Sequence, residues 1–194
     1  MKKENISDIL GVGFRLFAIT AISACLLAVV NEVTSPIIKI NTENAQIEAN
    51  KSVVKEAKSF NNVEFEDESG IVNSISEGVD SNGNTCGYAV SVLPKGYGGE
   101  ISLTVGIDNE CQVIGMEVIS QSETAGLGAK CTEKEFQNRF LGKTNGVTVV
   151  KNNAKDNEVD AISSATITSK AITKGVNAAL DSVKMLKGGN WYEE

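Results

Sequence analysis

Histidine is absent from the 194 residues of this chain, and aromatic residues and prolines are scarce. The commonest metal ligand and the commonest general base are therefore missing. The four cysteines include no Cys-x-x-Cys pair, so their spacing does not indicate zinc or an iron–sulfur cluster. We expect Cys86, Cys111 and Cys131 to act mostly as buried small apolar residues. The net charge of −7 argues against a nucleic-acid partner, because phosphate binding requires clustered lysine and arginine.

A long apolar run is present near the N-terminus. Residues 9–30 have about the length needed to cross a bilayer as one helix, and their only charge is Arg15, near the end where its side chain can snorkel. Lys2 and Lys3 precede the run and favour a cytoplasmic N-terminus, with the rest of the chain outside. The alternatives are a cleaved signal peptide, a lipoprotein signal at Cys25 and a buried soluble helix. The run is long, lacks a clear cleavage site and stays apolar after Cys25, so we expect an uncleaved single-pass anchor in the cell membrane.

The remaining sequence predicts one mixed domain. Pro36 is expected to begin a second, amphipathic helix over residues 37–60. Strands and helices then follow without regular βαβ alternation, which favours an α+β fold with a mixed or antiparallel sheet and flanking helices. We divide the chain into a cytoplasmic N-terminus with its transmembrane helix (1–34), a juxtamembrane helix (35–60) and an extracytoplasmic domain (61–194).

Individual elements of that domain follow from the periodicity of its apolar residues. Residues 64–84 are predicted to be loop with at most one short strand. The other predicted elements are strands at 86–93, 101–107, 111–119 and 147–150, a turn at 108–110, a short helix at 133–140 and a closing helix at 164–186.

A polar run immediately precedes the closing helix. It reads Asp160-Ala161-Ile162-Ser163-Ser164-Ala165-Thr166. Ser163 or Ser164 is expected to cap the helix, and Thr166 to lie in its first turn. Backbone N–H groups there lack intrahelical partners and the helix dipole favours an anion, so a phosphate would be stabilised beside Thr166. The plain alternative is a helix cap without further function.

Glycine-rich segments lie at both ends of the predicted hairpin. Gly96-Tyr97-Gly98-Gly99 precedes its first strand, where glycines allow close approach of the backbone. An ordinary turn entering a strand is the alternative interpretation. Residues 122–128 follow the second strand as a polar loop, and loops at strand ends often hold ligands.

The run at 160–166 resembles the flavinylation motif Asp-x-x-Ser/Thr-Gly-Ala-Thr, in which a transferase joins the phosphate of FMN to the last threonine. It matches at Asp160, Ser163, Ala165 and Thr166, and has Ser164 where glycine is usual.

The two glycine-rich segments extend this resemblance over the whole chain. Together with the threonine motif they are similar to the Gly-Tyr-x-Gly and Glu-Thr-Pro-Gly-Leu-Gly segments of one family, in the same order, with Ala125 in place of the proline. That family comprises the G subunit of the Rnf electron-transport complex and its relative, the C subunit of the sodium-pumping NADH:quinone reductase.

The resemblance implies a flavoprotein with FMN attached covalently to Thr166 as a phosphoester, and Asp160 as a recognition point for the flavin transferase. The other residues that it implies at the cofactor are Ser163, Ser164, Ala165 and Ile167 near the phosphate, Glu123, Thr124, Leu127 and Gly128 at the ring, and Tyr97 and Gly98 on the opposite side of the ring.

The implied function is electron transfer within a membrane-bound, ion-translocating ferredoxin:NAD oxidoreductase complex. The partners would be the other membrane subunits and, during maturation, the flavin transferase. No catalytic turnover is expected from the isolated subunit. A stand-alone extracellular flavin reductase and a membrane-tethered binding module without a cofactor are the alternatives.

Overall fold

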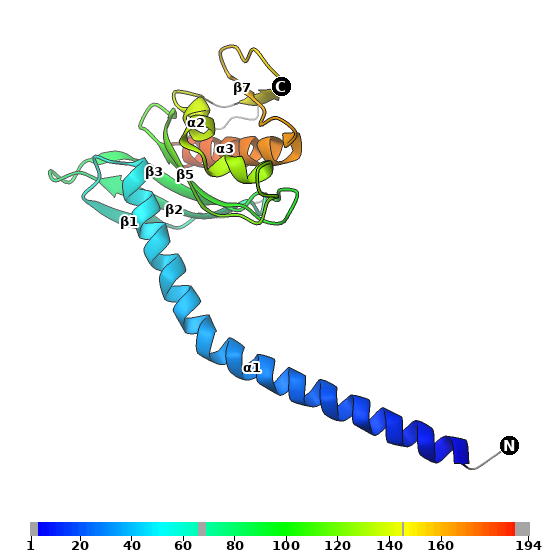
Figure 1. Ribbon diagram of the computed structural model, residues 1–194. Coiled ribbons are helices and arrows are strands. Elements are labelled where there is room, and N and C mark those ends of the chain that lie inside the picture. Colours follow the sequence, from blue (N-terminus) through cyan, green and yellow to red (C-terminus); the bar gives the residue numbers. More distant parts are fainter. Residues whose placement is uncertain (1–3, 66–68, 145, 189–194) are drawn as a thin grey trace. The chain divides into compact units, whose positions relative to one another are not determined.

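The structure is a computed structural model that describes residues 4–65, 69–144 and 146–188. The chain divides into two compact units, residues 1–44 and 45–194. Helix α1 (Glu4–Val53) makes up the described part of the first unit and contributes its last residues to the second. All further elements belong to the second unit (Figure 1).

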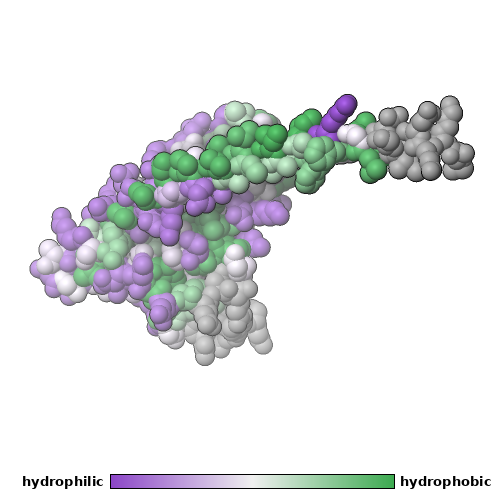
Figure 2. All heavy atoms as spheres, turned by 90° about the horizontal axis from the view of Figure 1, so that it is seen from below, coloured by the Kyte–Doolittle hydropathy of each residue, from purple (hydrophilic) through white to green (hydrophobic). Residues whose placement is uncertain are grey.

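Helix α1 contains the predicted membrane segment. It is long and apolar enough to cross a membrane, and its apolar side chains from Ile9 to Val30 are exposed, which is the opposite of a buried soluble helix. Figure 2 shows this apolar surface in green. Lys2 and Lys3, on which the orientation depends, lie outside the described residues.

The predicted break at Pro36 is wrong, as is the predicted helix end near residue 60. Pro36 lies inside α1, which continues to Val53. Proline removes one backbone donor and disfavours a helix interior, and the β-branched residues on both sides of it are weak helix formers, so local propensity does not explain why the helix continues. Beyond α1 the chain forms strand β1 (Ser59–Val63), which the sequence did not predict.

A five-stranded antiparallel sheet forms the centre of the domain. Its strands are β1, β2 (Val72–Val79), β3 (Thr85–Val92), β4 (Ser102–Ile107) and β5 (Val113–Ser120), and they pair in sequence order. The predicted hairpin is therefore confirmed as β4 and β5. The segment predicted as mostly loop contains the eight-residue strand β2.

The segment after β5 forms several short elements and then one long helix. They are the 3-10 helix η1 (Gly128–Thr132), helix α2 (Lys134–Gln137), the 3-10 helix η2 (Asn138–Phe140), the parallel strand pair β6 (Thr148–Val150) and β7 (Glu158–Asp160), and helix α3 (Thr166–Leu186). The α+β class with an antiparallel sheet and flanking helices is confirmed.

Helix α3 covers one face of the sheet (Figure 1). Leu103, Val105 and Ile107 of β4 are fully buried on that face, in one cluster with Ile172 and Val176 of α3. Burial of these side chains is the main stabilising term for the domain. The alternation of β4 and the three- and four-residue spacing of α3 produce these matching faces.

The opposite face of the sheet receives the end of α1. Gly106 and Gly115 pair across β4 and β5, and a Cβ atom at these positions would lie 2.5 and 2.7 Å from the carbonyl oxygen of Val53. Backbone therefore packs on backbone, which only glycine allows. The close packing ties residues 45–53 to the sheet as part of the same unit.

Candidate functional site

The three segments singled out in the sequence meet at the carboxylate of Glu123. Glu123 follows β5 and is only 8% exposed. Its Oε1 accepts the backbone N–H of Gly98 at 2.8 Å, and its Oε2 accepts the hydroxyl of Thr168 in the first turn of α3. One side chain thus connects the Gly96–Gly99 segment, the loop after β5 and the start of α3.

Three glycines make room for this arrangement. A Cβ atom at Gly96 would lie 2.5 Å from Glu123 Oε1, and one at Gly128 would lie 2.6 Å from Oε2 and 2.7 Å from the hydroxyl of Thr168. A Cβ atom at Gly98 would lie 2.1 Å from the carbonyl oxygen of Ser122. The glycines of both predicted motifs are therefore required by close packing around one carboxylate.

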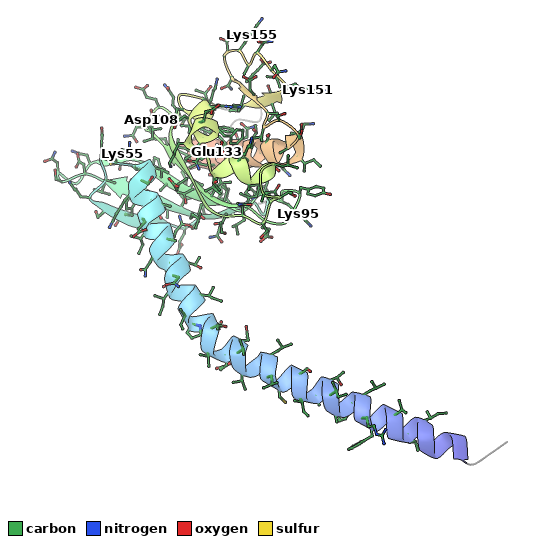
Figure 3. The ribbon with its side chains drawn as sticks, viewed as in Figure 1. Lys55, Lys95, Asp108, Glu133, Lys151 and Lys155 are labelled. Atoms are coloured by element: carbon green, nitrogen blue, oxygen red, sulfur yellow. The ribbon has the colours of Figure 1, made fainter. Side chains whose placement is uncertain are left out.

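Lys95 directly precedes the Gly96–Gly99 segment. Figure 3 labels it, toward the end of the sheet where α3, drawn in orange, begins. The turn at Gly96 is closed by its N–H, which donates to the carbonyl of Gly99 at 2.8 Å. This turn presents Tyr97 to solvent, 73% exposed.

The N-terminus of α3 is capped differently from the prediction. Ala165 is the N-cap residue and no side chain caps the helix, so the prediction of a Ser163 or Ser164 cap is wrong; both serines are exposed in a turn. The buried Ser169 fixes the turn instead, because its hydroxyl accepts the N–H of Ile162 at 2.9 Å and donates to the carbonyl of Ala165 at 3.0 Å. A buried serine one turn into the helix therefore holds the preceding turn in place, and the first N–H groups of the helix stay uncapped.

Free backbone donors are present at this helix start. Within the described part of the chain, the N–H groups of Thr166, Ile167 and Thr168 have no acceptor, whereas the N–H of Ala165 donates to Ile162 at 2.9 Å. Three donors at the positive end of α3 can bind an anion. Ala165 is thus not among the available donors, although the sequence places it in the same group.

The two threonines of the first turn face opposite ways. Residues two apart on a helix differ by about 200° in direction. Thr168 is 1% exposed and donates to Glu123, whereas Thr166 is exposed to solvent. Of these two hydroxyls, only that of Thr166 is accessible for modification.

Ser164 adopts a left-handed backbone conformation, with φ of 63°. A side chain with a Cβ atom is strained there, and glycine is not. The glycine that is usual at this position of the resembled motif therefore has a conformational reason, and the serine of this chain is accommodated at a cost.

Apolar side chains from all three segments are exposed at this end of the domain. Leu127 is 42% and Ile167 57% exposed, besides Tyr97. Thr124 is also exposed, and its carbonyl accepts the N–H groups of Leu127 and Ala129 at 3.1 and 3.2 Å, which closes the loop. The predicted residues therefore fall into two groups, with Glu123, Gly128 and Ala165 buried and most of the others at the surface.

Asp160 has a local structural role. It ends β7, and its Oδ1 accepts the N–H of Ala154 at 3.0 Å. Its carbonyl accepts a hydrogen bond from Arg139 Nη1 at 3.0 Å, and Arg139 is itself paired with Glu135 at 2.9 Å. Arg139 could not be found from the sequence, because a lone arginine in a short helix has no distinguishing pattern.

The cysteines differ in burial. Cys131 is fully buried, Cys86 and Cys111 are partly buried, and Cys25 is exposed. Burial, assisted by the negative charge of Glu123, raises the pKa of the Cys131 thiol to about 11. This thiol stays protonated and unreactive at neutral pH.

The region that contains these segments matches a known protein family. The model of the family described as FMN-binding domain matches residues 96–181, which include all three. The G subunit of the proton-translocating ferredoxin:NAD(+) oxidoreductase complex of Clostridium ljungdahlii is 31% identical, over 97% of this chain and 98% of the relative. The chain belongs to the family of G subunits of ion-translocating oxidoreductase complexes.

Another member of this family has a similar sequence identity to this chain. The G subunit of the Na(+)-translocating ferredoxin:NAD(+) oxidoreductase complex of Acetobacterium woodii is 35% identical, over 87% of this chain and 88% of its own length. The crystal structure of Shewanella oneidensis NqrC has the same fold, with a TM-score of 0.57 over 76% of this chain and all of that chain, at 15% identity.

Proposed function

We propose that the chain is the electron-transfer subunit of a membrane-bound ferredoxin:NAD oxidoreductase complex, and that it carries electrons on an FMN attached to Thr166. The relatives in Clostridium ljungdahlii and Acetobacterium woodii are named as G subunits of such complexes, one proton-translocating and one Na(+)-translocating. The observation that carries the proposal is the convergence of three separate motif segments on Glu123, beside an exposed threonine at a helix N-terminus.

The local geometry supports Thr166 as the attachment residue. Its hydroxyl is exposed, the three free N–H groups of the first turn favour a phosphate, and the neighbouring Thr168 is buried and already hydrogen-bonded. In the transfer from FAD, Thr166 Oγ1 forms a bond to the FMN phosphorus, the bond from that phosphorus to the AMP phosphate breaks, the hydroxyl proton is lost and AMP leaves.

Exposed side chains around Thr166 support a flavin ring at this end of the domain. Tyr97, Leu127 and Ile167 are large, apolar and exposed, and they come from three different segments. We assign the ring contacts to these three residues, with Thr124 and Gly98 at the rim. Ser163 and Ser164 line the phosphate end. When bound, FMN supplies the redox chemistry, and the protein sets its position, polarity and access.

Glu123 receives a different role from a direct ring contact. Both of its carboxylate oxygens already accept hydrogen bonds from the protein, and the side chain is buried. A buried, hydrogen-bonded carboxylate of this kind stabilises the segments that form the site. Asp160 keeps its proposed role in recognition by the transferase, in addition to its bond to Ala154.

We further propose that α1 anchors the subunit in the cell membrane with its N-terminus inside and the domain outside. Covalent attachment then has a clear purpose, because a lost flavin could not be replaced outside the cell. The ion pathway is assigned to the other subunits, since one helix whose apolar run contains only Arg15 provides no relay of charged groups. Protease added to intact protoplasts should digest the domain, and protection until lysis would contradict this orientation.

Complementation tests the function. Membranes from a strain that lacks this chain should show no ferredoxin-to-NAD turnover, and the wild-type chain should restore it. Thr166→Val should insert into the membrane but restore none, whereas Thr173→Val, a change on the same helix away from the site, should restore it. Full restoration by Thr166→Val would refute the proposal. Turnover of a small acceptor by the purified chain alone would favour a stand-alone reductase.

A further inference from the structure

Glu123 is the only charged side chain that is buried in the described part of the domain. Charged residues are almost never fully buried unless they are paired, because removing them from water is costly. The cluster gives no cation to pair with it: one carboxylate oxygen accepts a backbone N–H and the other accepts a hydroxyl. The free N–H groups at the start of α3 add a positive electrostatic potential, which favours a negatively charged carboxylate.

The two bonds join parts of the chain that are far apart in sequence. Gly98 is 25 residues from Glu123, and Thr168 is 45 residues from it. Gly96 and Gly128 bring backbone so close that a Cβ atom on either would lie 2.5–2.6 Å from a carboxylate oxygen. The carboxylate is thus enclosed on both sides by the segments that it connects.

The bond to Thr168 fixes the rotation of the first turn of α3. When Thr168 points inward to Glu123, Thr166 must point outward, because the two are about 200° apart around the helix. The other bond holds the Gly96–Gly98 turn, which carries Tyr97, against the same carboxylate. One group therefore sets the relative positions of an exposed hydroxyl and an exposed aromatic ring.

We infer that Thr168, Glu123 and Gly98 form a lock that positions Thr166 for flavin attachment and fixes the flavin surface around it. This inference rests on the proposed function. Thr168 and Glu123 are positioning residues: both are buried, and they act through the first turn of α3 and the Gly96–Gly98 turn. The lock accounts for the threonine at position 168, which the motif resemblance does not include.

The test compares four full-length variants, each incubated with FAD and the flavin transferase. Thr168→Val removes the donor at nearly constant shape, and Thr168→Ser keeps it. Thr173→Val is the matched control, because Thr173 is also a buried threonine of α3 and donates to the carbonyl of Ser169 at 3.0 Å. Thr166→Val reports on the attachment site itself.

The lock predicts that Thr168→Val slows the initial rate of flavin attachment about tenfold, the size of one lost hydrogen bond to a charged group. It also predicts lower fluorescence anisotropy of the attached flavin, because the surface around it is less fixed. Thr168→Ser should recover both properties. Thr173→Val should attach flavin at the wild-type rate, even where its thermal stability falls as far as that of Thr168→Val.

Two results would overturn the lock. One is a wild-type attachment rate and anisotropy in Thr168→Val, and the other is an equal loss in Thr173→Val at matched stability, which would show a general effect of weakening α3. If Thr168→Val does not fold, Glu123→Leu replaces it, because an apolar side chain of similar size removes both acceptors. Flavin attachment in Thr166→Val would instead refute the proposed function, so the two failures are distinguishable.

Discussion

Replacing Ser164 by glycine should stabilise the domain, although glycine usually destabilises a folded chain. Ser164 has φ of 63°, a region in which a Cβ atom costs about 1–2 kcal/mol. Glycine removes that strain, but it gives the unfolded chain extra freedom worth about 0.4–1 kcal/mol. The net gain should be about 0.5–1 kcal/mol, which raises the melting temperature of a domain of this size by about 1–4 °C.

Ser163 provides the matched control. It is the adjacent residue in the same turn, is also exposed, and has no left-handed backbone conformation. Ser163→Gly should therefore lose about 0.4–1 kcal/mol through the unfolded state alone. The two substitutions are chemically identical and one residue apart, yet they are predicted to have opposite signs.

Unfolding of the full-length chain in detergent, by urea and by heat, measures both variants before flavin is attached. Comparison of the two variants with each other removes most effects of detergent and of α1, which are common to both. Equal destabilisation by Ser163→Gly and Ser164→Gly would refute the argument that the conformation of Ser164 is strained.

Three further predictions follow from particular contacts. Burial raises the pKa of the Cys131 thiol from 9.0 to about 11, so the stability that the protonated thiol contributes is complete below about pH 9 and is lost as the pH rises to about 11. The unfolding free energies of wild type and Cys131→Ala should therefore converge between these pH values. Parallel curves of unfolding free energy against pH would contradict this. Gly106→Ala should cost about 1–3 kcal/mol in thermal unfolding, because its Cβ atom would lie 2.5 Å from the carbonyl oxygen of Val53, and an unchanged midpoint would exclude that close contact. Asp160→Asn should keep the bond to Ala154 and wild-type stability but slow flavin attachment, and an unaltered attachment rate would show that the transferase does not recognise the charge.

Local patterns predicted the parts of the fold that local physics determines. The alternation of β3, β4 and β5 and the helical spacing of α3 appear in the sequence because their apolar side chains line the faces on which the sheet and α3 pack together. Strand β1 and strand β7 were missed. The first is mostly exposed and the second has three residues, so neither has a periodicity to detect. Pro36 misled the prediction of α1, because proline is typical of helix starts and the helix nevertheless continues through it.

The candidate site was predictable in its segments but not in its connections. Motif resemblance assigned the three segments to one cofactor site, and it indicated Thr166 as the attachment residue. It could not indicate that Glu123 is buried, that Thr168 is its partner, or that Ser169 holds the turn before α3, because these depend on contacts that no local pattern encodes. Glycines at 96, 98 and 128 were visible as a pattern, and the structure supplies the close contacts that require them.

The central claim is a phosphoester between FMN and Thr166, and intact mass measures it most directly. The full-length chain, matured with the flavin transferase and then denatured, should exceed its calculated mass by one FMN less one water. Thr166→Val, matured in the same way, should have its calculated mass with no addition. An adduct of the same size on Thr166→Val, or an unmodified wild-type chain under conditions in which the transferase modifies a known substrate, would contradict the account.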